Sequence, residues 1–376
     1  MKSNSFYFFL IMSLSFFSCQ QKKAEKNNEE TTSVYQVKYA KGFSVKNYTD
    51  YRIVTVNDPW DSLKVLQTYV LVDKNKSMPQ NLPEGTLVRT PLGSVAVYST
   101  IHCTVLDKFG LLSIVKAVCE PEYINLSYIK DGLKKGNIVD LGLASNPNVE
   151  KLIMVDPEAI LASPIQGTPY GSIEKTGIPM IEIPDYMENT PLGRAEWIRF
   201  YSLFTGKEQL ADSLFTEIET EYNRVKNIIA SVSHRPSVFT EMKYGNTWYV
   251  AGGNSFIGNL LNDAGANYVW KDDKSTGAKP LSFESVLDRA GDAEFWLIKY
   301  NQTENMTYKS LEKESKAYSY FDAFKNKNIY ACNTGKSTYY EDLSIHPELI
   351  LQNMAYIFHP SLFPEYKPKY YNKIAD

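Results

Sequence analysis

The chain has 376 residues, which is too long for one ordinary hydrophobic core and therefore predicts two domains. A hydrophobic content of 43% and a charged content of 22% are typical of a globular protein and exclude a disordered or fibrous chain. A net charge of -3 provides no extended field of either sign, so we expect no binding to nucleic acid.

The start of the chain is expected to lie outside the fold. Residues 1–18 contain an apolar run that is too short to span a bilayer and is typical of a secretion signal. Cys19, at the end of this run, resembles the lipidation site of bacterial lipoproteins; a plain signal peptide is the alternative. Residues 19–34 are polar and poor in aromatic side chains, so we interpret them as a disordered tether between a membrane and the folded part.

The next segment, residues 35–92, is predicted to be a β-rich extension. Its runs FSVKNY, YRIVTVND and QTYVLVD alternate or are β-branched, and turns rich in Pro and Gly separate them. From Gly93 to residue 189, buried-strand patterns such as SVAVYST and IVKAVC alternate with short helical patterns. This alternation predicts parallel βα units, so we expect an N-terminal α/β lobe over residues 35–189 that includes the extension.

Residues 190–232 are predicted to be linking helices. Thr190 followed by Pro191 is a typical helix start, and Gly206 is expected to interrupt the segment. Beyond it, apolar residues recur at spacings of three and four and predict one helix of about 25 residues, roughly 37 Å long. This apolar stripe consists of Leu210, Leu214, Ile218, Tyr222, Val225 and Ile229.

The strand and helix alternation resumes in residues 233–376, which we expect to form a C-terminal α/β lobe. One local pattern occurs in both halves, as VEKLIMVDPEAIL from Val149 and FESVLDRAGDAEF from Phe283. Each copy places a glutamate, Glu150 or Glu284, near the start of a helix that leads into a strand. The repeat predicts two lobes of similar design with a long helix between them.

Metal and enzyme chemistry have little support in the sequence. The four histidines form no His-x-x-x-His pair, and the cysteines show no metal-ligand spacing. Cys103 and Cys119 have two open states, a disulfide or buried free thiols, and we favour the thiols. There is no G-x-S-x-G elbow, P-loop or H-E-x-x-H, so we expect no enzyme. A lipid-anchored hydrolase or a surface adhesion protein are the alternatives from other classes.

Three segments carry a resemblance to a known family: TPLGRAEWIRFYSLFTGKEQLADSLFTEIETEY in the linking region, AGGNSFIGNLLNDAGA after it, and IHPELILQNMAYIFHP near the end. From about Gly93 onward the chain resembles the substrate-binding proteins of ABC importers that capture ferric siderophores, haem and cobalamin. The resemblance implies two Rossmann-like α/β lobes joined by one long helix, with the ligand held between them. We therefore expect an iron complex as the transported ligand, with cobalamin as an alternative, and no resident cofactor.

The resemblance also implies partners. In this family each lobe carries an exposed glutamate that meets arginines of the membrane permease, and Glu150 and Glu284 stand at the matching positions. We expect a monomer that serves an ABC permease with its ATPase and is held to the membrane by lipid, on the periplasmic face of a double-membrane bacterium. The alternative role for both glutamates is to stabilise helix N-termini.

The ligand is expected where loops follow the carboxyl ends of the parallel strands. Flat aromatic side chains suit a chelate or macrocycle whose outer surface is largely apolar, although each of them singly is as well explained by packing. The expected ligand-binding residues are Tyr98, Ser99, Thr100, Tyr123 and Tyr170 in the first lobe, and Trp248, Tyr249, Tyr300, Tyr339 and Tyr340 in the second.

Overall fold

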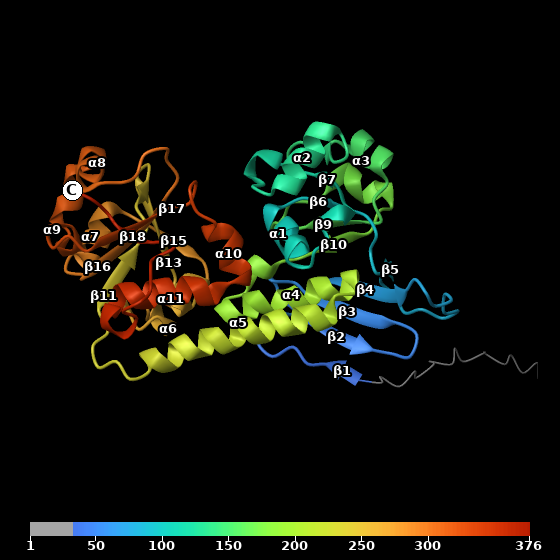
Figure 1. Ribbon diagram of the computed structural model, residues 1–376, viewed down its shortest axis with the longest axis horizontal. Coiled ribbons are helices and arrows are strands. Elements are labelled where there is room, and N and C mark those ends of the chain that lie inside the picture. Colours follow the sequence, from blue (N-terminus) through green and yellow to red (C-terminus); the bar gives the residue numbers. More distant parts are fainter. Residues whose placement is uncertain (1–32) are drawn as a thin grey trace, which may run out of the picture.

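The computed structural model describes residues 33–376, and the predictions for the signal, the tether up to residue 32 and Cys19 lie outside this range. Two α/β bodies lie side by side, and below them run two long helices next to a separate β-sheet (Figure 1). Among residues 33–376 no helix combines the length and the apolar character needed to cross a bilayer. The predicted α/β class, with two lobes and a β-rich extension, is confirmed.

The extension forms a five-stranded sheet in the order β1-β2-β3-β4-β5. The first four strands are antiparallel neighbours, and β5 runs parallel to β4. One face carries fully buried residues such as Val54, Val56 and Tyr69, which explains the alternation in the sequence. The strands are β1 (Ser33–Tyr35), β2 (Phe43–Asn47), β3 (Arg52–Asn57), β4 (Val65–Asp73) and β5 (Thr86–Thr90).

The N-terminal lobe contains a five-stranded parallel sheet in the order β10-β9-β6-β7-β8. Alternate residues of its strands belong to two different apolar clusters, Val95 and Val97 to one and Ala96 to the other, so both faces are covered. The elements are β6 (Val95–Val97), α1 (Thr100–Lys108), β7 (Val115–Val118), α2 (Ser127–Lys135), β8 (Val139–Asp140), α3 (Val149–Val155), β9 (Ala159–Ala162) and β10 (Met180–Glu182).

The C-terminal lobe has a main sheet in the order β14-β11-β16-β17-β18, parallel except for β18, and a small antiparallel sheet β12-β13-β15. Its strands are β11 (Ser237–Thr240), β12 (Lys243–Tyr244), β13 (Thr247–Ala251), β14 (Asn267–Tyr268), β15 (Ala278–Leu281), β16 (Phe295–Tyr300), β17 (Ile329–Asn333) and β18 (Asn372–Lys373). Its helices are α6 (Phe256–Asp263), α7 (Phe283–Ala290), α8 (Tyr308–Glu314), α9 (Asp322–Lys325), α10 (Tyr339–Ile345) and α11 (Pro347–Phe358).

The repeated sequence pattern corresponds to a repeated topology. Helix α3 leads into β9, which pairs in parallel with β6, the first strand of its lobe. Helix α7 leads in the same way into β16, which pairs in parallel with β11. The four-strand orders β10-β9-β6-β7 and β17-β16-β11-β14 therefore correspond strand by strand. Glu150 and Glu284 consequently occupy equivalent places in the two lobes.

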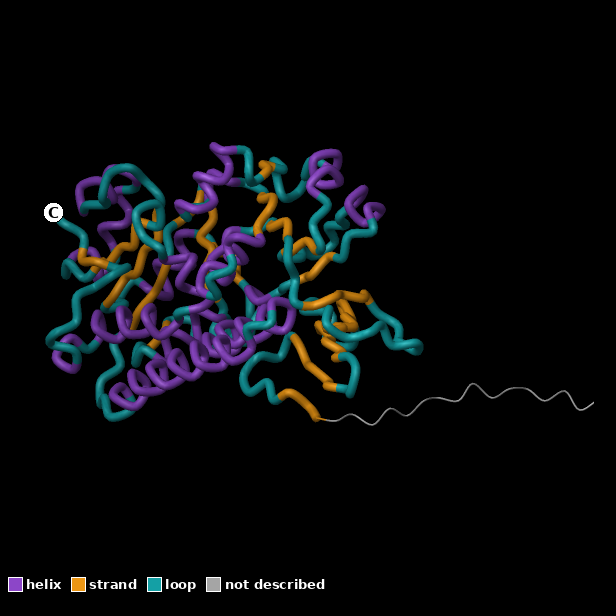
Figure 2. Tube along the Cα trace, turned by 45° about the vertical axis from the view of Figure 1, so that its right-hand side comes forward, coloured by secondary structure: helices purple, strands orange, loops and turns teal. Residues whose placement is uncertain are grey.

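The linking region consists of α4 (Pro191–Thr205) and α5 (Glu208–Ile229). Gly206 separates them, as predicted, because its φ of +66° ends α4 in a left-handed cap. Helix α4 is buried nearly all round, and α5 packs on α4 and on α11 (Figures 1 and 2). The predicted stripe of α5 is correct from Ile218 onward but shifts by one position at its start, where Ala211 and Phe215 are buried and Leu210 is exposed.

Two buried carboxylates fasten the extension to α4 and the segment before it. Glu196 accepts the backbone N–H groups of Lys38, Tyr39 and Ala40 at 2.6 to 3.1 Å. Glu188 accepts those of Lys41 and Gly42 at 2.7 and 2.8 Å. Five consecutive donors thus meet two charged acceptors, and hydrogen bonds to a charged group are among the stronger ones in proteins. The extension is therefore an integral part of the fold.

The three cysteines of the described range, Cys103, Cys119 and Cys332, are buried free thiols. This confirms the thiol interpretation over a Cys103–Cys119 disulfide. Burial raises the pKa of Cys103 and of Cys119 to about 12, so both thiols stay protonated at neutral pH.

Candidate ligand-binding site

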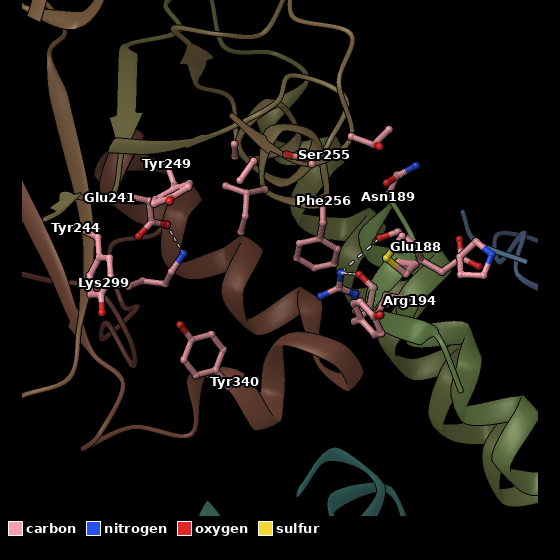
Figure 3. Close-up of a pocket in the computed structure, with 18 of the residues that line it drawn as sticks. Glu188, Asn189, Arg194, Glu241, Tyr244, Tyr249, Ser255, Phe256, Lys299 and Tyr340 are labelled. Atoms are coloured by element: carbon pink, nitrogen blue, oxygen red, sulfur yellow. Dashed lines mark hydrogen bonds and ion pairs between the residues drawn. The ribbon is translucent and has the colours of Figure 1, made fainter. Parts of the chain in front are cut away.

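A cavity of about 750 Å³ lies at the carboxyl edge of the C-terminal sheet. Residues at or beyond the carboxyl ends of β11, β16 and β17 meet there with the start of the linking region, as Figure 3 shows. A volume of this size suits a small-molecule ligand larger than an amino acid or a single sugar. The walls carry the aromatic side chains of Tyr186, Tyr244, Tyr249, Phe256 and Tyr340.

Lys299 and Glu241 form an ion pair inside this cavity (Figure 3). Burial by itself would lower the pKa of Lys299, but the Glu241 carboxylate outweighs it and holds the pKa above its ordinary value. Lys299 is therefore a cation at neutral pH, and its side chain is only 16% exposed. Glu241 directly follows β11 in a left-handed conformation, with φ of +69°, and its carbonyl accepts the indole N–H of Trp296 at 2.6 Å.

Arg194 supplies a second cation from the first turn of α4. Its guanidinium lies 4.0 Å from the centroid of the Phe256 ring and donates to the backbone carbonyl of Tyr186. Burial raises the pKa of the nearby Asp185 to about 6, although the positive charge of Arg194 opposes that rise. In Figure 3, Arg194 and Phe256 lie on one side of the cavity, while Tyr244 and Lys299 lie on the other.

The lining combines two cations, Lys299 and Arg194, with two carboxylates, Glu241 and Glu188, and with flat aromatic walls. Such a lining suits a ligand that has a large apolar or aromatic surface and also carries polar or charged groups. Across residues 33–376 no group of three or more His, Cys, Asp and Glu side chains is placed to hold a metal ion.

A smaller cavity, of about 290 Å³, lies at the carboxyl edge of the N-terminal sheet. Tyr98, Ser99 and Tyr170 line it, together with Glu120, which follows β7 in a left-handed conformation with φ of +49°. Tyr98 is 5% exposed, and burial raises the pKa of its hydroxyl. The two cavities share no lining residue, so the predicted side chains of the two lobes do not meet in a single cavity.

The expected ligand-binding residues divide into four groups, of which the first, Tyr98, Ser99 and Tyr170, lines the smaller cavity. Tyr249 and Tyr340 line the larger cavity, with 49% and 56% of their surface exposed. Trp248 and Tyr339, in contrast, are fully buried, which corrects the expectation that they form its walls. Trp248 packs among Phe239, Trp296 and Phe321, and its indole N–H donates to the Thr240 carbonyl at 3.0 Å.

Three further expected residues line neither cavity: Thr100, Tyr123 and Tyr300. Thr100 begins α1 and donates to the Tyr123 carbonyl at 3.4 Å, while the Tyr123 side chain is 65% exposed. The Tyr300 hydroxyl accepts the backbone N–H of Met306 at 3.0 Å, which holds the ring against its own loop. Their place at strand ends was predicted correctly, but they lie outside both cavities.

Sequence reasoning missed Arg194, Lys299 and Phe256. A signal existed for Lys299, because a lysine inside the apolar run FWLIKY is costly unless it has a partner or a ligand. Arg194 offered no such signal, since a polar residue in the first turn of a helix is ordinary. Tyr186 and Phe256 were likewise indistinguishable from packing residues.

Glu150 and Glu284 are both exposed, each in the first turn of its helix. Asn148 caps α3 and Ser282 caps α7 through side-chain acceptors, so the helix starts are satisfied without the glutamates. The backbone amide of Glu284 and the Ser282 hydroxyl hold the pKa of Glu284 below its ordinary range. Both glutamates are therefore exposed at the first turn of a helix, one in each lobe.

Two topologically equivalent α/β lobes, a helical link and a cavity at the carboxyl edge of a parallel sheet are the features expected of a substrate-binding protein of the periplasmic type. The sequence agrees: residues 95–334, well over half of the chain, match the periplasmic binding protein family, and the chain belongs to that family. Its members bind substrates for ABC-type transporters and are not enzymes, which confirms the expectation of no enzyme.

Similar proteins include two uncharacterised lipoproteins of Methanocaldococcus jannaschii. One is 26% identical over 82% of this chain and 76% of its own length, and the other is 24% identical over 94% and 92%. Among solved structures, a periplasmic haem-binding protein of Pseudomonas aeruginosa has a TM-score of 0.58 at 17% identity, covering 76% of this chain and 99% of its own. A possible iron-binding protein of Staphylococcus epidermidis has a TM-score of 0.57 at 18% identity, covering 72% and 100%.

Proposed function

We propose that this protein captures an anionic iron complex, a ferric siderophore or haem, and delivers it to the permease of an ABC importer. The observation that carries the proposal is the larger cavity, where Lys299 and Arg194 stand among five aromatic side chains. Catecholate siderophores and haem are both anionic and both present broad aromatic surfaces. Similar solved structures are described as iron-binding and haem-binding proteins, which is consistent with this ligand class.

Binding in this cavity would use the two cations for orientation and the aromatic walls for affinity. Lys299 is held by Glu241, so its ammonium is already in place before the ligand enters. Tyr244, Tyr249 and Tyr340 have exposed rings that are available for stacking. A phenolate of one of these tyrosines would also suit haem iron, which separates the haem case from an already saturated ferric siderophore.

The test is a binding screen combined with spectroscopy. Protein purified from its native host is examined by absorption spectrum and mass spectrometry for a copurified chelate. Apo protein is then melted with haemin, a ferric tricatecholate, a ferric trihydroxamate and cobalamin. A true ligand at 100 times its dissociation constant adds about 2.7 kcal/mol and raises Tm by several degrees. No copurified chelate and no shift with any of the four would overturn the proposed function.

We further propose that Cys19 carries a lipid anchor. Support comes from the apolar run that precedes it and from the relatives named as lipoproteins. Replacing Cys19 by Ser is expected to release the protein from the membrane fraction without changing its ligand affinity. Mass spectrometry of the mature N-terminus provides the direct reading, and an unmodified Cys19 would contradict the anchor.

A further inference from the structure

One residue of the larger cavity comes from the β-rich extension. Pro59 belongs to the loop between β3 and β4 of the extension, outside residues 95–334 that match the family. It faces the cavity together with Glu188, Asn189 and Arg194. Figure 3 shows these three labelled residues on the side opposite Tyr244 and Lys299. We name residues 58–64 the rim loop.

The rim loop has a defined shape of its own. The Asp58 carboxylate accepts the backbone N–H groups of Trp60 at 2.8 Å and Asp61 at 3.1 Å. The base of the loop is closed by the Asp58 N–H, which donates to the Lys64 carbonyl at 3.0 Å, and by the Lys64 N–H to the Asp61 carbonyl at 2.9 Å. A loop that is already ordered loses little entropy when a ligand contacts it.

The rim loop is also fixed relative to the cavity. Asn57, at its base, donates its backbone N–H to the Gly42 carbonyl and its side-chain amide to the Lys41 carbonyl, both at 2.8 Å. Lys41 and Gly42 in turn donate to Glu188, which itself lines the cavity. A Cβ on Gly42 would lie 2.5 Å from the Trp197 ring, so this junction is closely packed. Two successive hydrogen bonds therefore connect the cavity wall to the loop.

The composition of the rim loop is unusual for a solvent-exposed turn. Pro59 and Trp60 are only partly covered, and Leu63 is 95% exposed. Pro59 lines the cavity, and Trp60 and Leu63 follow it in the same loop, so the loop carries three apolar side chains that solvent does not stabilise. Carboxylates in this loop point into its own hydrogen bonds, so the face offered to a ligand is apolar.

We propose that the rim loop is a third wall of the binding site, which contacts the apolar face of the bound chelate through Pro59 and Trp60. The proposal rests on the proposed function and adds a specificity element that the two lobes do not supply. Lys299 of the C-terminal lobe and Arg194 of the linking helix α4 hold the anionic groups of the ligand, and the rim loop covers part of its hydrocarbon surface.

The test compares two loop replacements in the full chain. In one variant residues 59–63 become Gly-Ser-Gly-Ser-Gly; in the matched control residues 77–81, in the loop between β4 and β5, become the same sequence. Dissociation constants are measured for haemin and for a ferric tricatecholate. We expect the rim-loop variant to bind at least fivefold more weakly, which is about 1 kcal/mol, and the control to stay within twofold of the wild type.

Hydrogen exchange gives a second reading that needs no variant. In the wild type, amides of residues 58–64 should exchange more slowly when the protein is saturated with the bound probe, while those of residues 77–81 should not change. If the replacement disturbs folding, Trp60→Ser serves in its place. Equal affinity of rim-loop variant and wild type, or equal exchange with and without ligand, would overturn the proposal. A wild type that binds neither of these probes, binds no other chelate of the screen and copurifies with none would instead contradict the proposed function itself.

Discussion

At the scale of single residues, the ion pair of Lys299 and Glu241 determines the charge that a ligand meets. The two side chains are partly buried in the cavity and lie against Tyr339, whose ring centroid is 5.9 Å from the Lys299 ammonium. A buried pair of this kind is sensitive to removal of either partner, because the other charge is left uncompensated. The two partners nevertheless differ in what they offer an anionic ligand.

Lys299→Gln and Glu241→Gln form a matched pair of variants. Both break the same ion pair, so both should lose stability by a similar amount. Lys299→Gln removes the cation and should weaken binding of haemin or a ferric tricatecholate by at least tenfold, about 1.4 kcal/mol. Glu241→Gln leaves the cation free and should bind these anions as well as the wild type or better. Equal losses of ligand affinity in the two variants, measured by titration calorimetry, would show that the ion pair contributes only to folding.

The free energy of unfolding is expected to depend on pH through His102. Its side chain projects from α1 and is fully buried against α4. Its Nδ1 lies 2.6 Å from the Tyr201 hydroxyl, and its Nε2 lies 3.3 Å from the Ser163 hydroxyl. Burial lowers its pKa to about 3, against about 6.5 in the unfolded chain. Between pH 3 and pH 6.5 the unfolded chain binds a proton at His102 that the folded chain does not bind. The stabilisation of the folded state by neutral His102 is therefore present above pH 6.5 and is lost as the pH falls.

We expect His102→Gln to remove this dependence. Between pH 7 and pH 4.5 the wild type should lose about 2.5 kcal/mol through His102, and the variant should not. The difference in unfolding free energy between the two proteins, measured with urea at both pH values, should therefore narrow by that amount at pH 4.5. A difference that stays constant would mean that the pKa of His102 is the same in the folded and in the unfolded chain.

At the scale of elements, the extension and α4 behave as one unit. The aromatic rings of Phe43 and Tyr69 pack on Trp197, Phe200 and Phe204, and the carboxylates of Glu188 and Glu196 hold the backbone of residues 38–42. Glu196 is fully buried and is also paired with Arg199 at 2.8 Å. The sheet thus stabilises the helix that carries Arg194 into the ligand cavity.

Glu196→Gln should therefore be strongly destabilising. The amide keeps only one acceptor oxygen and turns a donor toward backbone N–H groups that already need acceptors. We expect a loss of about 2–4 kcal/mol in the free energy of unfolding, measured by chemical denaturation. Glu217→Gln, on the exposed side of α5, is the control and should change it by less than about 0.5 kcal/mol. A small effect at Glu196 would imply that the extension is held by its apolar contacts alone.

At the scale of the whole molecule, the two lobes present equivalent helix starts to the outside. Because the strand orders of the two sheets correspond, Glu150 and Glu284 lie at the starts of equivalent helices in the two lobes. We propose that both glutamates dock on arginines of the permease, one for each lobe, through bidentate contacts. A partner that holds both lobes in this way would sense their separation when ligand is bound.

Glu150→Ala combined with Glu284→Ala should abolish uptake of the ligand and leave its affinity unchanged, since neither residue lines a cavity. Glu122→Ala combined with Glu312→Ala removes two other exposed glutamates of the same lobes and serves as the control. Transport into cells and ligand affinity are measured for both double variants. Normal uptake by the first one would refute the docking role.

The sequence by itself determined the kinds of elements, their order and the repeat of the two lobes. These features depend on local causes: alternation in β2 and β3, the cap at Thr190, the left-handed glycine at position 206, and the spacing of apolar residues in α5. Each of them is set by residues that are close together along the chain, so the pattern can be read without the fold.

Only the tertiary structure decided which side chains share a cavity. Trp248 and Tyr249 are neighbours in β13 and point to opposite faces of the strand, so Trp248 lies in the core and Tyr249 lines the cavity. Both are aromatic residues in one short sequence run, so the sequence alone does not distinguish their positions. Tyr339 and Tyr340 divide in the same way on α10. Pro59, Arg194 and Lys299 lie far apart in the sequence and meet at one cavity, because packing between distant segments is not encoded in any local pattern.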